Sequence, residues 1–120
     1  MQIDLKKISI FAENNICMTD IIDKIKQVAK DVIPLNGDAV LYGSRARGDA
    51  NADSDWDLLI LLDKSKLEQS DYDNIAYPFT YLGWQLGQSI IPVLYTKQEW
   101  QNMSFMPFYK NVETDKIKLL

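Results

Sequence analysis

A polar loop enclosed between two apolar runs constrains this chain more than any other feature. The first run, residues 39–42, is short, and the second, residues 56–62, is apolar apart from Asp57. Short apolar runs without polar alternation are typical of strands in a sheet that helices cover. We therefore expect two buried strands, joined by a loop that carries the chemistry.

Asp55 and Asp57 stand where the second strand begins. Because successive side chains of a strand point to opposite faces, these carboxylates project to one side and Trp56 to the other. Neighbouring carboxylates repel each other unless a cation lies between them, and hard oxygen ligands suit Mg²⁺. We predict a metal site at Asp55 and Asp57, whereas Asp49 and Asp53 fit the ordinary turn-forming role of aspartate.

Gly43 and Ser44 turn the chain out of the first strand. We expect a short helix here, whose free N–H groups can cradle phosphate. A phosphate cradle facing a carboxylate pair indicates chemistry on a nucleoside triphosphate. Arg45 and Arg47 neutralise the acids of the loop, and a guanidinium freed from a carboxylate suits phosphate equally well. Tyr42, beside the cradle, either packs in the core of the first strand or stacks on a base, and core packing is favoured.

Two familiar loops do not fit this stretch. Residues 43–48 have the glycine spacing of a P-loop, but Asp49 and Ala50 stand where Lys and Ser or Thr must follow. A calcium loop that starts at Asp49 would need glycine in place of Ser54 and a bidentate glutamate in place of Ile60. Neither loop is predicted.

Composition excludes several other kinds of chemistry. The chain of 120 residues has no histidine and a single cysteine, Cys17, so a zinc site and a serine–histidine or cysteine–histidine triad are excluded. A net charge of −4 argues against a general nucleic-acid binder. No apolar run approaches the roughly 18 residues of a membrane span. We expect a soluble, cytoplasmic protein that contacts neither membrane nor nucleic acid directly.

The chain is expected to form one α/β domain over residues 1–120, in which residues 1–17 are an N-terminal extension without a clear period. Apolar periodicity predicts the remaining elements. They are a helix over 19–33, a helical stripe over 75–86, an edge strand over 89–96, helices over 97–102 and 107–113, and an extended end over 117–120.

Several residues predict where these elements begin and end. The expected caps and stops are Thr19, Ser65 or Ser70 as N-caps, and Pro34, Gly83 and Gly87 as stops. Pro78 either kinks the second helix or begins its second part. Pro92 cannot donate to a ladder, which favours an edge position. Trp100 is expected to pack on the core.

The loop also carries a resemblance to a known family. Gly43-Ser44-Arg45-Ala46-Arg47-Gly48-Asp49-Ala50, followed by Ser54-Asp55-x-Asp57-Leu58, resembles the signature of the DNA polymerase β-type nucleotidyltransferases, and of their minimal nucleotidyltransferase (MNT) branch in particular. Residues 92–100 and 107–113 look like the later segments of small MNT proteins. The resemblance covers about residues 18–120.

The resemblance implies a small mixed sheet flanked by helices, with ATP as substrate and Mg²⁺ as cofactor. It implies that Gly43 and Ser44 hold the triphosphate, that Asp55 and Asp57 are catalytic and bind the metal, and that Arg47 assists with phosphate. A third carboxylate on a later strand usually completes such a site, but residues 89–95 contain no Asp or Glu. Glu99, after this strand, could contribute only from a different geometry.

Two hypotheses of function follow. The first is a Mg²⁺-dependent nucleotidyltransferase that moves AMP, or another nucleoside monophosphate, to a hydroxyl on a protein partner. The resemblance implies that the partner is a HEPN ribonuclease toxin and the chain its antitoxin. The second is a non-catalytic module that neutralises its partner by occlusion, with a degenerate site. The intact Gly-Ser and Asp-x-Asp motifs favour the first, and the missing third carboxylate favours the second. The sequence leaves open whether the chain forms an oligomer.

Overall fold

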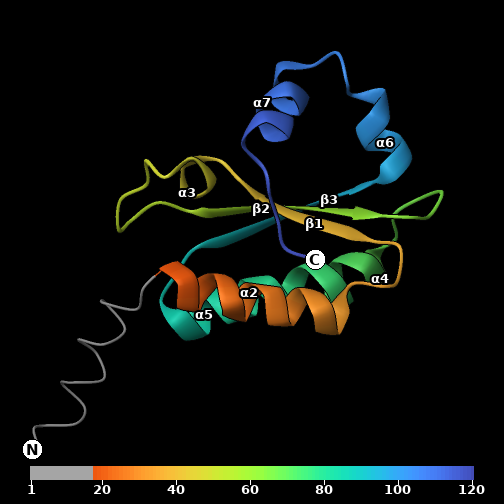
Figure 1. The fold of residues 1–120 in the computed structure, drawn as a ribbon. Helices are drawn as coiled ribbons and strands as arrows, with labels where there is room; N and C mark the ends of the chain where they lie inside the picture. The colour runs from red at the N-terminus through yellow and green to blue at the C-terminus, as the bar shows by residue number, and fades with distance from the viewer. Residues whose placement is uncertain (1–17) are drawn as a thin grey trace, which may run out of the picture.

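A four-stranded mixed sheet organises residues 18–120, the part of the chain that the computed structural model describes (Figure 1). The strand order is β3-β2-β1-β4, in which β1 is antiparallel to β2 and β4, and β2 is parallel to β3. The strands are β1 (Asp38–Tyr42), β2 (Trp56–Leu62), β3 (Ile90–Thr96) and β4 (Ile117–Lys118). The predicted α/β class and strands are confirmed, while the expected N-terminal extension lies outside the described residues.

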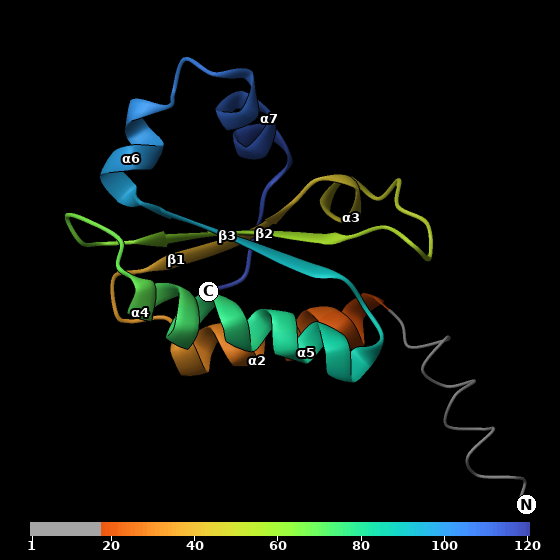
Figure 2. The same ribbon diagram turned by 180° about the vertical axis from the view of Figure 1, so that it is seen from behind.

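Helices cover both faces of this sheet. The helices α2 and α5 lie side by side against one face, and α6 and α7 lie over the other, as Figures 1 and 2 show from opposite sides. Their bounds are α2 (Met18–Val32), α3 (Ser44–Arg47), α4 (Gln69–Asp71), α5 (Tyr77–Leu86), α6 (Lys97–Asn102) and α7 (Pro107–Asp115). No helix of the described residues is long and apolar enough to cross a membrane.

The central strand β2 is apolar apart from Asp57 because both of its faces are covered by helices. Leu58 and Ile60 point into the larger core, which they share with side chains of α2 and α5 such as Ile25 and Phe79. Leu59 points the other way, into a smaller core that contains Trp100 of α6 and Val112 of α7. A strand buried on both sides loses the polar alternation of a half-exposed strand, which explains the continuous pattern.

The predicted helix caps are wrong at two helices. The helix α2 begins at Met18, so Thr19 lies inside its first turn. The helix α4 is capped by Glu68, whose backbone N–H donates to Asp71 Oδ2 at 2.7 Å in a reciprocal capping box. Acidic side chains therefore satisfy the donors that Ser65 or Ser70 was expected to satisfy.

Pro78 begins the second part of a longer helical segment. A π-helical turn, η1 (Tyr72–Ala76), ends just before α5, and Pro78 occupies the first turn of α5. There the missing N–H of proline costs no helical hydrogen bond. Gly87 ends α5 in the left-handed conformation, with φ of 66°. Gly83 is no stop, because it lies within α5 where a Cβ would come 2.7 Å from the carbonyl oxygen of Gln88.

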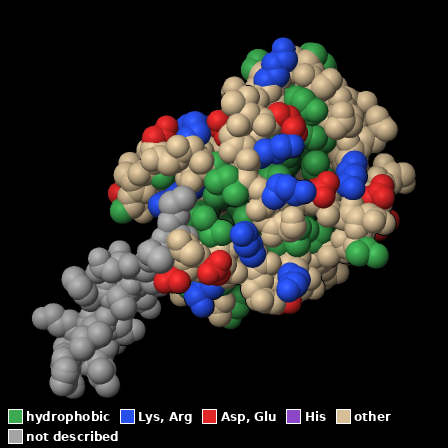
Figure 3. Space-filling view, viewed as in Figure 1, with side chains coloured by type: hydrophobic (Ala, Val, Ile, Leu, Met, Phe, Trp, Pro, Cys, Tyr) green, Lys and Arg blue, Asp and Glu red, His purple; other side chains and the backbone are tan. Residues whose placement is uncertain are grey.

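Each edge of the sheet is occupied by a strand that limits further pairing. Pro92 lies in β3 at one edge, as predicted, and β4 at the other edge is only 2 residues long. Acidic and basic side chains are interspersed on the face seen in Figure 3.

Candidate active site

The Gly43 turn and the Asp57 carboxylate are in direct contact. Tyr42 at the end of β1 pairs with Asp57 on β2, so the next residue, Gly43, passes over this carboxylate. A Cβ built on Gly43 would lie 2.5 Å from Asp57 Oδ2. Gly43 has φ of 77° and ψ of −160°, a conformation that is essentially restricted to glycine. The structure thus brings together the two motifs that the sequence singles out.

Asp55 and Asp57 interact electrostatically at this point. Asp57 is half-buried, and the pKa of its carboxyl is raised, first by burial and then by the negative charge of Asp55. The positive charge of Arg47 opposes this shift in pKa. A carboxylate that is withdrawn from water beside another carboxylate favours a nearby cation.

The neighbouring strand contributes no acid to this pair. Ile91 is the register partner of Asp57 in the parallel β2–β3 ladder, so the two side chains share one face of the sheet. Glu99 lies beyond the far end of β3, where its Oε1 accepts a hydrogen bond of 2.8 Å from the N–H of Thr96 and caps α6. Within residues 18–120, no group of three or more Asp, Glu, Cys or His side chains is arranged to hold a metal ion.

The helix α3 opens directly from the Gly43 turn, as expected. The N–H groups of Ala46 and Arg47 donate to the carbonyl oxygen of Gly43 at 3.0 Å. Ser44 and Arg45 stand at the start of the helix, where an N–H group has no carbonyl of the same helix to bond. Such donors beside a carboxylate pair provide the arrangement in which an anion and a cation can be held together.

Arg47 ties this helix to α7. Its Nη1 donates to Asp115 Oδ2 at 2.9 Å, and its Nε donates to Asp49 Oδ2 at 3.1 Å. The expected neutralising role of Arg47 is confirmed for Asp49. Asp115 was not singled out in the sequence, because it lies 68 positions from Arg47 and only the packing of α7 brings it to the site.

Arg45 holds the loop together and does not neutralise its acids, so that expectation is wrong. Its Nη2 donates to the carbonyl oxygens of Ser54 at 3.0 Å and Ala52 at 3.4 Å. Its guanidinium lies over the Trp56 ring, 4.4 Å from the centroid. Because Trp56 is fully buried at the start of β2, this contact fixes the loop that leads into Asp55 and Asp57.

Tyr42 packs in the smaller core, as favoured from the sequence. Its ring meets Phe108 of α7 edge-on, with 5.6 Å between centroids. Burial, followed by the charges of Asp57 and Tyr95, raises the pKa of Tyr42 to about 12. Its hydroxyl therefore stays protonated at neutral pH beside the carboxylate.

We expect Gly43→Ala to weaken binding of a Mg²⁺–nucleotide complex by tenfold or more. The new methyl group would collide with the Asp57 carboxylate, and the backbone strain would cost about 1–3 kcal/mol. Titration calorimetry with a non-hydrolysable ATP analogue measures the change in affinity.

Gly48→Ala is the matched control for this substitution. Gly48 also has a positive φ, of 87°, but no atom lies within 4 Å of a Cβ built there. We expect a smaller loss of stability, because Gly48 has the left-handed conformation (φ 87°, ψ 13°) that other residues can adopt, and nucleotide affinity should be retained. Equal loss of affinity in both variants would show that contact with Asp57 is irrelevant.

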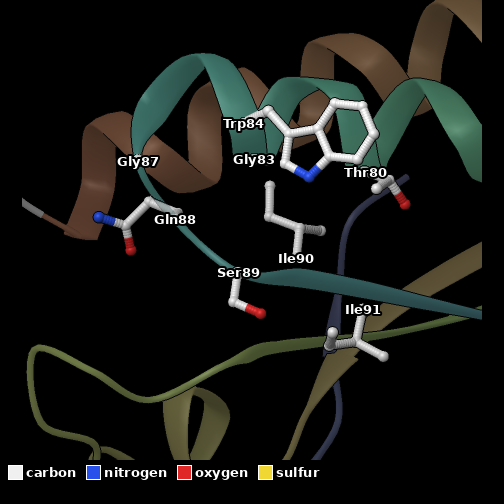
Figure 4. A pocket seen from close by; sticks show the side chains of 8 residues that line it. All are labelled: Thr80, Gly83, Trp84, Gly87, Gln88, Ser89, Ile90 and Ile91. Carbon is white, nitrogen blue, oxygen red and sulfur yellow. The ribbon is translucent and has the colours of Figure 1, made fainter.

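An open pocket of about 590 Å³ lies between the end of α5 and the start of β3 (Figure 4). Trp84 and Ile90 face each other across it, while Ile91 points to the opposite side of the strand, toward the face that carries Asp57. The sequence showed no motif for this pocket, since its walls come from the end of α5 and the start of β3.

Comparison with known proteins identifies the fold. Residues 20–118 match the family model of the nucleotidyltransferase domain. One similar solved structure is the crystal structure of a toxin–antitoxin with AMP-PNP, with 20% sequence identity and a TM-score of 0.56. The match covers 82% of this chain and 72% of the other chain. A mutant of the toxin–antitoxin MntA–HpeT shares 17% identity over 82% and 72% of the respective chains, with a TM-score of 0.55. None of the curated proteins matches this chain.

Proposed function

This chain belongs to the nucleotidyltransferase domain family, and on that premise we propose that it transfers AMP, or another nucleoside monophosphate, from a nucleoside triphosphate to a hydroxyl group of a protein. The observation that carries this proposal is the contact between Gly43 and Asp57. It places a turn that can bind an anion directly against the Asp57 carboxylate, whose negative charge is disfavoured by burial and by Asp55. A metal–triphosphate complex would supply a cation for the carboxylates and an anion for the turn.

Mg²⁺ fits the donors at this site. Asp55 and Asp57 offer hard carboxylate oxygens, and Mg²⁺ is ordinarily held by one or two carboxylates together with substrate phosphates and water. Bound there, it would stabilise negative charge on the phosphates and on the departing pyrophosphate. The chain's own residues would then orient the substrate, Gly43 and Ser44 through the turn and Arg47 through its guanidinium.

The transfer itself needs a hydroxyl acceptor and a destination for its proton. The acceptor oxygen bonds to the α-phosphorus, the bond from that phosphorus to the β-phosphate oxygen breaks, and pyrophosphate leaves. With Ile91 beside Asp57, no protein carboxylate from β3 is placed to take the proton, which passes instead to solvent or to a base on the acceptor.

We propose a toxin as the protein acceptor and an antitoxin role for this chain. The solved structures with this fold include a toxin–antitoxin with AMP-PNP, and residues 92–100 and 107–113 resemble the later segments of MNT proteins that pair with HEPN toxins. Residues 18–120 contain no second domain that could enclose a small acceptor. This favours an acceptor hydroxyl that is presented by another protein.

The test is to incubate the chain with ATP, Mg²⁺ and a co-encoded HEPN protein and to measure the mass of that protein. We expect an AMP adduct with the native chain and none with Asp55→Ala/Asp57→Ala. Asp53→Ala is the matched control, because Asp53 is an exposed acid of the same loop, and it should retain transfer.

The same experiment separates the enzyme from an occluding binding module. The absence of an acid from β3 beside Asp57 favours the module. If the partner gains no AMP and Asp55→Ala/Asp57→Ala inhibits it as well as the native chain does, the transferase proposal is wrong.

A further inference from the structure

The segment from α5 to the end of β3 is uncharged and yet exposes large side chains. No Asp, Glu, Lys or Arg occurs between Asp73 and Lys97, although 25% of the chain is charged. Three aromatic residues of α5 are nevertheless exposed, Tyr77 by 49%, Tyr81 by 49% and Trp84 by 65%. We refer to these three as the aromatic ridge.

The aromatic ridge is preorganised by contacts among its own members. The rings of Tyr77 and Tyr81 are stacked, with 6.2 Å between centroids. Tyr77 also meets Trp84 edge-on at 5.8 Å. Rigid tyrosine and tryptophan side chains lose little entropy on binding, and they are enriched in the contacts that dominate protein interfaces.

The ridge continues into the pocket at the start of β3. Trp84 forms one wall of the pocket, and Ile91, 42% exposed, lies at the opposite end (Figure 4). Because Ile91 is the register partner of Asp57, this end of the pocket adjoins the candidate metal site. An uncharged surface therefore leads from α5, around the edge strand β3, to the reacting position.

The geometry of transfer indicates which reactant approaches along this surface. The anion-binding turn at Gly43 lies on the β1 side of Asp57, and Ile91 lies on its β3 side. In a displacement at phosphorus, the attacking and leaving oxygens stand roughly in line. With the departing pyrophosphate held at the Gly43 turn, the acceptor hydroxyl arrives from β3.

We propose that the aromatic ridge and the pocket from Trp84 to Ile91 are the docking site of the acceptor protein. The inference rests on the proposed transfer and adds where the acceptor binds. The uncharged surface suits a protein segment with an apolar or aromatic anchor that fills the pocket and sets the hydroxyl beside Ile91. A nucleic-acid acceptor would require Lys or Arg to meet its phosphates, and this segment has none.

The test measures affinity for the purified HEPN partner by titration calorimetry with Trp84→Ala and with Phe105→Ala. Phe105 is the matched control, an aromatic residue exposed by 76% between α6 and α7, away from the ridge. We expect Trp84→Ala to raise the Kd for the partner at least tenfold and Phe105→Ala to change it less than twofold. Both variants should bind the Mg²⁺ complex of AMP-PNP with native affinity.

The outcomes separate this inference from the proposed function. Native partner affinity in Trp84→Ala, together with AMP transfer by the native chain, would overturn the docking site and leave the transferase standing. If Trp84→Ala binds the partner more weakly and the native chain transfers no AMP, the docking site is supported and the transferase proposal is refuted. If light scattering shows a native dimer that Trp84→Ala converts to a monomer without affecting partner affinity, the ridge joins two copies of this chain and the inference is wrong.

Discussion

Asp57→Asn is expected to lower the proposed AMP transfer by roughly a hundredfold to a thousandfold, the cost of removing one preorganised electrostatic group. The same substitution is expected to stabilise the metal-free protein. Asparagine keeps the shape of the side chain against Gly43 but could not supply an anionic oxygen to the proposed Mg²⁺. Function and stability should therefore change in opposite directions, which a general folding defect cannot produce.

The expected gain in stability follows from the raised pKa of Asp57. A carboxyl whose pKa is higher in the folded state than in the unfolded state contributes stability at low pH that is lost as the pH rises through the folded value. Above the folded pKa the native chain has lost this contribution, because the Asp57 carboxylate then carries its charge half-buried and near Asp55. Since Asp57 is only half-buried, solvent screens the effect, and we expect Tm to rise by about 1–3 °C.

Thermal unfolding in EDTA between pH 3 and pH 7 measures this effect. The difference in Tm between Asp57→Asn and the native chain should shrink as the pH falls, because protonated aspartic acid is neutral like asparagine. Asp53→Asn, in the same loop, is the control for removing one negative charge. A lower Tm of Asp57→Asn at pH 7 would contradict the electrostatic account.

Trp100→Ala is expected to cost about 3–5 kcal/mol of the free energy of unfolding, the range for truncating a buried tryptophan. Trp100 is 1% exposed, and its ring contacts Tyr109 at 4.8 Å and Phe108 at 5.6 Å between centroids. Its Nε1 also donates to Glu113 Oε2 at 3.0 Å. The substitution removes the side chain that joins α6 to α7 over the smaller core.

Urea unfolding followed by circular dichroism measures this loss. Trp84→Ala is the matched control, since it removes the same side chain from an exposed position and should change the free energy of unfolding by less than about 0.5 kcal/mol. Trp100→Phe should lie between the two. Equal stability of Trp100→Ala and Trp84→Ala would show that the smaller core contributes little.

The fold was largely predictable because the signals for it are local. A continuous apolar run predicted β2, and helical spacing predicted α2 and α5 within one or two residues of their ends. The caps were less predictable. Glu68 and Asp71 cap α4 reciprocally. Serine is a preferred N-cap residue, so the sequence favoured Ser65 or Ser70 over this acidic pair.

The candidate site was predictable only where its residues share one hairpin. Gly43 and Asp57 come together because β1 and β2 pair directly, which sequence spacing allowed us to anticipate. Asp115 and the Trp84 pocket depend on how α7 and α5 pack. The prediction for Arg45 was wrong because its partners are the carbonyl oxygens of Ser54 and Ala52. Every residue has such an oxygen, so the residue types in the loop could not indicate this contact.

The candidate site and the aromatic ridge come from two separate segments of the sequence, which the parallel pairing of β3 with β2 brings together. Residues 42–57 hold the contact between Gly43 and Asp57, whereas residues 77–91 form the aromatic ridge and the pocket. They meet at the start of the β2–β3 ladder, where Ile91 lies beside Asp57, and through Trp56, whose Nε1 donates to Gln88 Oε1 at 2.9 Å. A substitution of an exposed residue on the ridge can therefore alter that surface while the contact between Gly43 and Asp57 stays intact.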